Sequence, residues 1–314
     1  MRAVVVTRHG GPEVLELQDA PEPQAGEGEL LVDVEAIGVN FRDVYEREGG
    51  YGGAPPYGAG AEGAGTVVGT GERVAWKSAP GSYAERVVVS EREAVPVPEG
   101  VSSELAAAVL LQGTTAQYLA TSTYRVQPGD DVVVLAAAGG VGQLLTQIVK
   151  LRGGRIIAVT SSEEKAQLAR DVGADEVLRY EGFGERVREL TGGGAAVVYD
   201  GVGRATFDES LDALRPRGFM VLYGAASGQP DPVPVPKIQP RSLYLTRPQL
   251  HHYTATREEL LERAREVFEW VRDGKLKVQI GGRYPLEDAP RAQEDLESRR
   301  TTGKLILLPR DLSE

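Results

Sequence analysis

The residues that point most clearly to chemistry form a glycine-rich turn between two apolar runs. The run Val132–Leu135 is continuous and β-branched, as expected for a parallel strand that is covered on both faces. Gly139, Gly140 and Gly142 follow it, and an amphipathic helical pattern occupies Val141–Leu151. The free N–H groups and the positive dipole end of such a helix favour a bound anion. The pattern therefore predicts a site for a nucleotide pyrophosphate.

The first position of this turn is Ala136, where the usual dinucleotide fingerprint has a glycine. We expect φ to stay negative at a residue that carries a Cβ. Gly139 and Gly140 are then the points at which the pyrophosphate comes closest to the backbone. Glycine patterns also occur in ordinary βα turns, so the interpretation depends on the strand before the turn and the helix after it.

A second strand-like run ends in Thr160-Ser161-Ser162, and no carboxylate stands at its tip. An acidic side chain there would hold the ribose 2′-hydroxyl of NAD. Hydroxyl donors followed by the ammonium of Lys165 suit a 2′-phosphate instead, which favours NADPH. The alternative is that Ser161 or Ser162 caps the next helix and that Lys165 is a surface charge.

The elements that would position these residues alternate between strand and helix patterns. This alternation predicts a doubly wound parallel sheet. The predicted strands are Val132–Leu135, Arg155–Val159, Glu176–Leu178, Ala196–Tyr199, Phe219–Leu222 and Leu243–Leu245. The predicted helices are Val141–Leu151, Glu163–Val172, Gly184–Leu190 and Ala205–Leu214.

The rest of the chain has a different pattern. Short β-rich runs fill its first third, a loop rich in Gly and Pro is predicted at Gly49–Gly65, and a helix is predicted from Thr256 to Asp273. A strand-like tail follows at Lys304–Leu308. If this tail returns to the N-terminal strands, the nucleotide domain is an insertion within a second domain.

Composition narrows the class of protein. A length of 314 residues suggests two domains, and no apolar run reaches the roughly 20 residues of a membrane span. The net charge of -11 argues against nucleic-acid or anionic-membrane partners. The chain has no cysteine, and we see no secretory signal at its start, so we expect a cytoplasmic protein.

The same composition leaves few metal ligands. The chain has no cysteine, and its only histidines are His9, His251 and His252. Two adjacent histidines without further ligands rarely complete a metal site. We therefore expect no metal. Without a Lewis acid to stabilise an alkoxide, reduction of an activated acceptor is favoured over oxidation of an alcohol.

Five motifs occur in order over essentially the whole length: Gly38–Tyr45, Ala137–Gly142, Val197–Gly203, Ser242–Pro248 and Leu296–Arg299. In these motifs the chain resembles the zinc-independent quinone oxidoreductases of the medium-chain dehydrogenase/reductase superfamily, the group that includes zeta-crystallin. The resemblance implies a Rossmann domain at 112–246 inserted in a GroES-like catalytic domain formed by 1–111 and 247–314. It also implies NADPH as the cofactor and a homodimer joined through an edge strand near Leu243.

The resemblance further implies a set of contacting residues. Those implied to line the nicotinamide and substrate cleft are Asn40 and Tyr45, with Tyr51 at its mouth and Thr115 on the nicotinamide side. Those implied to meet the pyrophosphate are Gly139, Gly140 and Val141. Those implied farther along the cofactor are Ser161, Lys165 and Tyr180 at the adenosine phosphate, Gly224 and Ala225 at a strand end, and Arg247 and Arg299 as second-domain contacts.

For the chemistry, a quinone or enone accepts hydride readily once it is aligned with the donor. Tyr45, Tyr51 or solvent would supply the proton, whereas Asn40 is expected to orient its neighbours because an amide is not acidic. Asp43 either orders the cleft or serves as a structural cap or surface ion pair. Two alternatives to quinone reduction stay open: a 2-alkenal or enoyl reductase, and a non-catalytic role as a crystallin-like or single-stranded nucleic-acid-binding protein. The acidic net charge weighs against nucleic-acid binding.

Overall fold

The computed structural model describes residues 1–50, 53–298 and 301–310. The chain forms two compact units, one made of Met1–Thr114 and Thr256–Glu314 and the other of Thr115–Ala255. The sequence prediction ended the middle unit at residue 246, nine residues before the end that the structure gives. The additional residues include the 3-10 turn η5 (Leu250–Tyr253). The ring of Tyr253 stacks on that of Tyr118 in the middle unit, with ring centroids 4.2 Å apart, which ties this turn to the unit.

The middle unit is built on one six-stranded sheet, and all of its pairings are parallel. The strand order is β11-β10-β9-β12-β13-β14. The strands are β9 (Asp131–Leu135), β10 (Arg155–Val159), β11 (Glu176–Leu178), β12 (Ala195–Asp200), β13 (Leu214–Leu222) and β14 (Tyr244–Thr246). This is the doubly wound order of a Rossmann fold, so the predicted fold class is confirmed.

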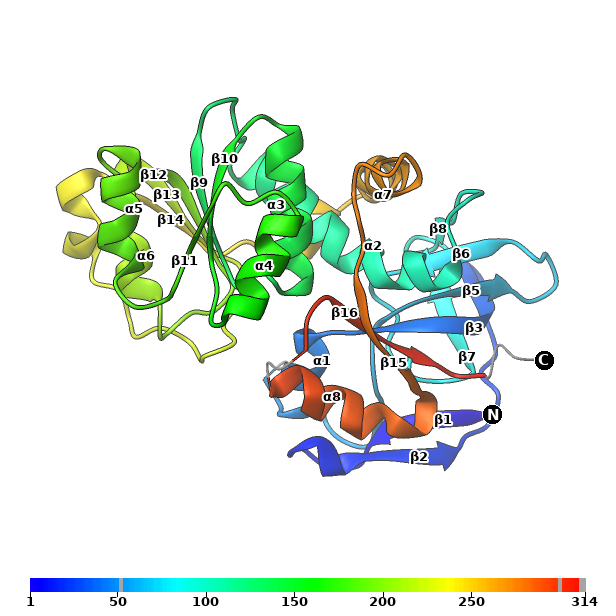
Figure 1. Cartoon of the computed structure of the whole chain (residues 1–314). Helices are drawn as coiled ribbons and strands as arrows, with labels where there is room; N and C mark the ends of the chain where they lie inside the picture. The colour runs from blue at the N-terminus through cyan, green and yellow to red at the C-terminus, as the bar shows by residue number, and fades with distance from the viewer. Residues whose placement is uncertain (51–52, 299–300, 311–314) are drawn as a thin grey trace. The chain divides into compact units, whose positions relative to one another are not determined.

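Helices cover both faces of this sheet (Figure 1). They are α3 (Gly140–Leu151), α4 (Glu163–Asp171), α5 (Phe183–Thr191) and α6 (Phe207–Asp212). Alternate side chains of each strand point to opposite faces. Val133 and Leu135 accordingly pack in one apolar cluster with Phe183 and Val187 of α5. These four side chains are at most 1% exposed. Their packing fixes the sheet against its helices and holds the strand ends in place.

The other unit is rich in antiparallel strands. A seven-stranded sheet has the order β15-β16-β3-β5-β6-β8, with β7 also on β3, and a three-stranded sheet has the order β2-β1-β4. The strands are β1 (Arg2–Val6), β2 (Leu15–Asp19), β3 (Glu29–Val39), β4 (Tyr57–Gly58), β5 (Glu62–Val67), β6 (Arg73–Trp76), β7 (Arg86–Ser90), β8 (Val95–Pro96), β15 (Ile280–Pro285) and β16 (Lys304–Leu308). The C-terminal strand β16 pairs with β3, Leu305 opposite Val39, so the predicted return of the tail is confirmed.

The prediction of a loop at Gly49–Gly65 is wrong where the structure has strands, which are β4 (Tyr57–Gly58) and the start of β5 at Glu62. Glycines occur there since neighbouring groups leave no room for side chains. A Cβ on Gly63 would lie 2.6 Å from the Trp76 ring, and one on Gly65 would lie 2.0 Å from the carbonyl oxygen of Asp33. Glycine in this strand marks a close approach of backbone and ring.

The helices of the β-rich unit are α1 (Phe41–Arg47), α7 (Arg257–Arg272) and α8 (Ala289–Glu297), and α2 (Ser103–Tyr118) contains the boundary between the units. Helix α7 begins at a capping box, in which Thr256 and Glu259 satisfy each other's backbone N–H groups. No helix in the described part of the chain has both the length and the apolar character that a membrane crossing requires.

Candidate functional site

The strand order of the middle unit defines where a ligand can bind. The chain leaves β9 toward β10 on one side and reaches β12 on the other, so the order reverses between β9 and β12. In open parallel sheets, ligands bind outside the carboxyl ends of the strands at such a switch point. The segment that follows β9 at this edge is the turn from Ala136 to Gly142.

The backbone of this turn differs from the prediction. Ala136 has φ +51°, in the left-handed region, whereas the sequence predicted a negative φ. A left-handed alanine costs about 1–2 kcal/mol. The surrounding contacts offset that cost: the N–H of Ala136 donates to the phenol oxygen of Tyr180 at 3.2 Å, and its carbonyl accepts from the N–H of Gly139 at 2.8 Å.

Gly142 allows the helix to begin against the turn. A Cβ on Gly142 would lie 2.4 Å from the Ala136 carbonyl oxygen and 2.8 Å from the Cα of Ala137. Helix α3 starts after Gly139, with no side-chain cap and no acidic residue in its first turn. Its leading N–H groups, from Gly140 and Val141 onward, therefore have no side chain of their own segment to accept them, which suits an anion.

The tip of β10 carries the hydroxyl groups that the sequence singled out. Ser162 is the N-cap of α4 and accepts from the Lys165 N–H at 3.3 Å, so one of the two serines does cap the helix. Ser161 is exposed. The hydroxyl oxygen of Thr160 is buried and has no hydrogen-bond partner among the described residues. The strand tip thus combines an exposed serine with one buried hydroxyl that has no partner among the described residues.

The first-turn acid Glu163 does not oppose an anion at this tip. Its carboxylate pairs with Arg170 at 2.7 Å and with Arg179 at 3.0 Å. The hydrogen bond and charge of Arg170, together with the charge of Arg179, lower the pKa of Glu163 below its usual range. Its negative charge is therefore compensated by two guanidinium groups on the protein side.

The loops after β12 and β13 pack tightly on each other. The buried Asp200 at the end of β12 accepts from the N–H groups of Val202 and Gly203 and from two hydroxyls. A Cβ on Gly224 would lie 2.6 Å from the Gly201 carbonyl oxygen, and Ala225 beside it is buried. These loops are fixed at the same edge of the sheet as the Ala136–Gly142 turn.

Two other predicted positions, Thr115 and Arg247, have a clear place in the middle unit. Thr115 lies half-buried in α2, on the side of the boundary that belongs to the middle unit. Arg247 follows β14 and donates to the side chain of Gln229, within the same unit. Tyr51 and Arg299 lie outside the described residues, so their predicted roles stay predictions.

In the β-rich unit, Asn40 is the last residue before α1 and lies in a buried polar cluster. Its Oδ1 accepts from the Lys304 ammonium at 2.7 Å, and its Nδ2 donates to Glu62 at 2.8 Å. The Lys304 ammonium also donates to the same Glu62 oxygen at 2.6 Å. All three side chains are at most 4% exposed. The sequence analysis missed Glu62 and Lys304, although each is a lone charge in an otherwise apolar or glycine-rich run.

Asp43 lies on the other side of Asn40. Its carboxylate accepts from the Asn40 backbone N–H at 2.9 Å and from the Tyr83 hydroxyl at 2.9 Å, and its second oxygen is buried without a partner among the described residues. Burial raises the pKa of Asp43 to about 6, against the lowering influence of Arg42 and of these hydrogen bonds. Asp43 therefore closes the N-terminus of α1 as a structural cap, and its burial excludes a surface ion pair. Its ordering of the cleft stays a prediction.

Tyr45 lies half-buried on α1, one turn after Phe41, with ring centroids 6.2 Å apart. The two adjacent histidines, His251 and His252, lie exposed in η5. Among the described residues, no three His, Asp or Glu side chains gather in a group that could hold a metal ion.

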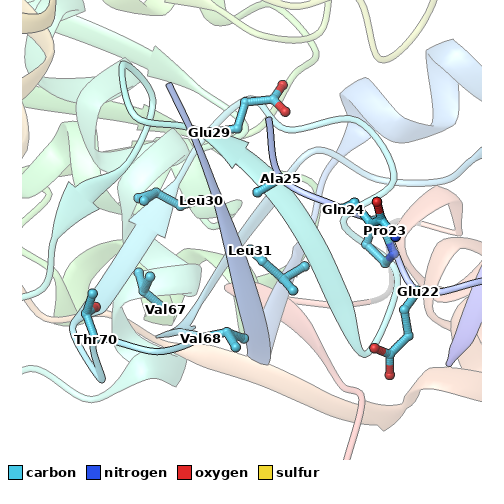
Figure 2. A pocket seen from close by; sticks show the side chains of 10 residues that line it. All are labelled: Glu22, Pro23, Gln24, Ala25, Glu29, Leu30, Leu31, Val67, Val68 and Thr70. Atoms are coloured by element: carbon cyan, nitrogen blue, oxygen red, sulfur yellow. The ribbon is translucent and has the colours of Figure 1, made fainter. Parts of the chain in front are cut away.

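A hollow in the surface of the β-rich unit contains none of the predicted residues (Figure 2). Leu30 and Leu31 of β3 and Val67 at the end of β5 contribute apolar side chains to it, and Glu22 and Glu29 contribute carboxylates. It has no hydroxyl or cationic cluster comparable to the β10 tip, so it is not the candidate site.

Together, the uncapped α3 N-terminus, the left-handed turn and the unsatisfied Thr160 hydroxyl fit a dinucleotide, and the tip without a carboxylate fits a 2′-phosphate. The turn at Ala136–Gly142 could hold the pyrophosphate of NADPH, and the contacts of Ser161, Lys165 and Tyr180 with its adenosine end stay predictions.

Two family profiles match the chain. The family described as alcohol dehydrogenase GroES-like domain matches residues 26–99, and the family described as zinc-binding dehydrogenase matches residues 140–270. A quinone oxidoreductase of Pseudomonas aeruginosa is 44% identical over 317 residues, which cover 96% of this chain and 97% of that protein. A 2-haloacrylate reductase of a Burkholderia species is 38% identical over 98% of this chain and 98% of that protein. The crystal structure of Escherichia coli quinone oxidoreductase complexed with NADPH has a TM-score of 0.95 at 39% identity, over 98% of this chain and all of that one.

Proposed function

Because this chain belongs to the quinone oxidoreductases of the medium-chain dehydrogenase/reductase superfamily, we propose that it reduces quinones with NADPH as the hydride donor. The observation that carries the proposal is the uncapped N-terminus of α3, which follows β9 after the short turn that begins at Ala136 and so shares a sheet edge with the polar tip of the adjacent β10. The chain has no cysteine, and within the described part of the chain no three His, Asp or Glu side chains gather in a group that could hold a metal ion, which supports hydride transfer without a metal.

The middle unit would bind the nucleotide. Backbone N–H groups at Gly139, Gly140 and Val141 would meet the pyrophosphate, where the α3 dipole favours negative charge. Ser161 and Lys165 would meet the 2′-phosphate through a hydroxyl donor and an ammonium. When bound, NADPH supplies the hydride, and the loops at Gly224 and Ala225 would limit where it lies.

The β-rich unit would act on the acceptor. Asn40 cannot serve as an acid, so we assign it an orienting role. The phenol of Tyr45 is our candidate donor of the proton that the reduced oxygen needs, with Tyr51 as an alternative donor and solvent as a third source. A quinone is already electrophilic, so alignment and exclusion of water would be the main contributions of the protein. Thr115, Arg247 and Arg299 stay proposed contacts of the cofactor.

An acceptor panel tests this function. We expect NADPH oxidation with 1,4-benzoquinone and larger naphthoquinones, and slower oxidation with crotonaldehyde-type enones. The 2-haloacrylate reductase among the relatives makes an activated alkene the second candidate acceptor. If enones were turned over faster than every quinone, alkene reduction would take the place of quinone reduction as the proposed function. Electron paramagnetic resonance in the same reactions would separate two-electron reduction from release of a quinone radical.

We also propose a homodimer and a cytoplasmic location. Strand β14 lies at the end of the parallel sheet, and its side chains Tyr244 and Leu245 are 53% and 37% exposed. An exposed edge strand with apolar side chains favours pairing with a second copy. Light scattering during size-exclusion chromatography should give twice the mass of 33.6 kDa, and Leu245→Lys should give the monomer mass. The cytoplasmic pool of NADPH and the lack of cysteine support the location, which cell fractionation would test.

A further inference from the structure

We propose that Lys304 and Glu62 are positioning residues that fix the orientation of the Asn40 carboxamide for acceptor reduction. The inference deepens the proposed function and rests on it for its kinetic consequence. Three strands bring the groups together: Asn40 follows β3, Glu62 begins β5 and Lys304 begins β16. No sequence motif contains more than one of them.

The hydrogen bonds use almost every polar site of the carboxamide. The two hydrogens of Nδ2 are accounted for by Glu62 Oε2 at 2.8 Å and by the Gly38 carbonyl at 3.2 Å. Oδ1 accepts from the Lys304 ammonium at 2.7 Å and, more weakly, from the Gln112 side chain at 3.5 Å. Asn40 therefore has no uncommitted N–H to offer an acceptor oxygen.

A flipped carboxamide would lose all of these bonds. Nδ2 would then face the ammonium of Lys304 and the amide nitrogen of Gln112, which are donors, while Oδ1 would face the carboxylate of Glu62. Two buried donors or two buried acceptors in contact are strongly unfavourable where solvent is excluded. The ion pair thus selects one of the two orientations of the amide.

The backbone is shaped to hold this arrangement. The second oxygen of Glu62 accepts from the Leu111 N–H at 2.7 Å, so both carboxylate oxygens are fixed. A Cβ on Gly38 would lie 2.3 Å from Glu62 Oε2 and 2.7 Å from the Ala107 carbonyl oxygen, so only glycine leaves space for the carboxylate. A buried ion pair is weak evidence for stability, and specification of one geometry is its better-supported use.

The chain contains a matched control for this pair. Lys77 donates to Glu93 at 2.9 Å in the same unit, with the Lys77 side chain 5% exposed and that of Lys304 1% exposed. Lys77→Met should therefore disturb a buried ion pair without touching Asn40. Lys304→Met leaves Glu62 buried without its cation, so Glu62→Gln/Lys304→Met is the variant that removes both charges and protects folding.

The kinetic test compares these variants with 1,4-benzoquinone and NADPH. We expect the Glu62→Gln/Lys304→Met protein to lose about 10- to 100-fold in kcat, since small displacements of a positioning group have effects of that size. The Kd for NADPH should stay within about threefold, because most of the proposed nucleotide contacts lie on the other unit, and Lys77→Met should keep kcat within about twofold. A folded double variant with wild-type kcat, or an equal loss in Lys77→Met, would overturn the proposal.

A second readout does not depend on turnover. Asn40 is the single asparagine of the sequence, so asparagine-selective ¹⁵N labelling gives one side-chain NH₂ group by NMR. We expect two resolved protons that exchange slowly with solvent in the wild type and in Lys77→Met, and at least tenfold faster exchange in Glu62→Gln/Lys304→Met. Fast exchange in the wild type would refute the fixed carboxamide. If the wild type reduced no quinone, the proposed function would fail while this signal still decided the orientation.

Discussion

The backbone N–H of Ala136 donates to the phenol oxygen of Tyr180 at 3.2 Å, which ties the Ala136–Gly142 turn to the segment after β11. The bond helps to hold Ala136 at φ +51° and so shapes the turn before any nucleotide binds. A net hydrogen bond of about 1 kcal/mol corresponds to roughly a fivefold change in an equilibrium constant.

Tyr180→Phe should therefore weaken NADPH binding about five- to tenfold, because the N–H of the turn loses its acceptor. Fluorescence titration of NADPH measures the Kd. Tyr124→Phe is the control, since Tyr124 donates to Asp130 at 2.9 Å in the same unit without touching the turn. An unchanged Kd in Tyr180→Phe would show that the turn does not need this bond.

Lys165 is predicted to select NADPH over NADH. Lys165→Ala should raise the KM for NADPH about tenfold or more and leave that for NADH nearly unchanged, because only NADPH carries the 2′-phosphate. Lys150→Ala, which removes an exposed partner of Asp175, should change neither constant. The selectivity assignment fails if NADPH KM is the same in Lys165→Ala and the wild type.

Tyr45 is predicted to donate a proton to the acceptor. Tyr45→Phe should lower kcat for quinones about tenfold or more, while the Kd for NADPH stays the same. Tyr57→Phe provides the comparison, because the Tyr57 hydroxyl donates to the Glu46 carbonyl at 2.8 Å and so has a structural bond to lose. Wild-type kcat in a folded Tyr45→Phe protein would leave Tyr51 or solvent as the proton source.

Asp43 should give the unfolding equilibrium a specific pH dependence. Its folded pKa of about 6 lies above the ordinary 3.8, so its stabilising contribution is present at low pH and is lost as pH rises from about 4 to about 6. A difference of about two pKa units corresponds to about 3 kcal/mol. The unfolding free energy of Asp43→Asn minus that of the wild type should therefore increase by about 3 kcal/mol as the pH rises from 4 to 7.

Denaturant titrations at several pH values measure this difference. Other carboxylates, such as Asp33 and Asp175, have lowered pKa values and act in the opposite direction, but they are common to both proteins and cancel in the comparison. A difference between Asp43→Asn and the wild type that is flat with pH would contradict the raised pKa.

The parallel sheet was predictable because its signals are local. Apolar β-branched runs such as Val132–Leu135 and amphipathic runs such as Val141–Leu151 define strands and helices by their own periodicity. Ser162 as a helix cap was likewise foreseen, as one of two readings, from residue type alone.

The features that sequence reasoning missed depend on contacts between distant segments. The positive φ of Ala136 goes with a hydrogen bond that its N–H donates to Tyr180, 44 positions away, which overrides the local preference of alanine. Lys304 and Glu62 are 242 positions apart and meet only because β16 returns to β3 beside β5. A lone charge in an apolar strand was their only local signal.

The central claim is that the chain transfers hydride from NADPH to a quinone. The most direct measurement is the kcat/KM for NADPH and for NADH at a saturating concentration of 1,4-benzoquinone, with hydroquinone quantified as the product. We expect one hydroquinone for each NADPH oxidised and a higher kcat/KM for NADPH than for NADH. No quinone-dependent oxidation by a folded protein that binds NADPH, or a higher kcat/KM for NADH, would contradict the account.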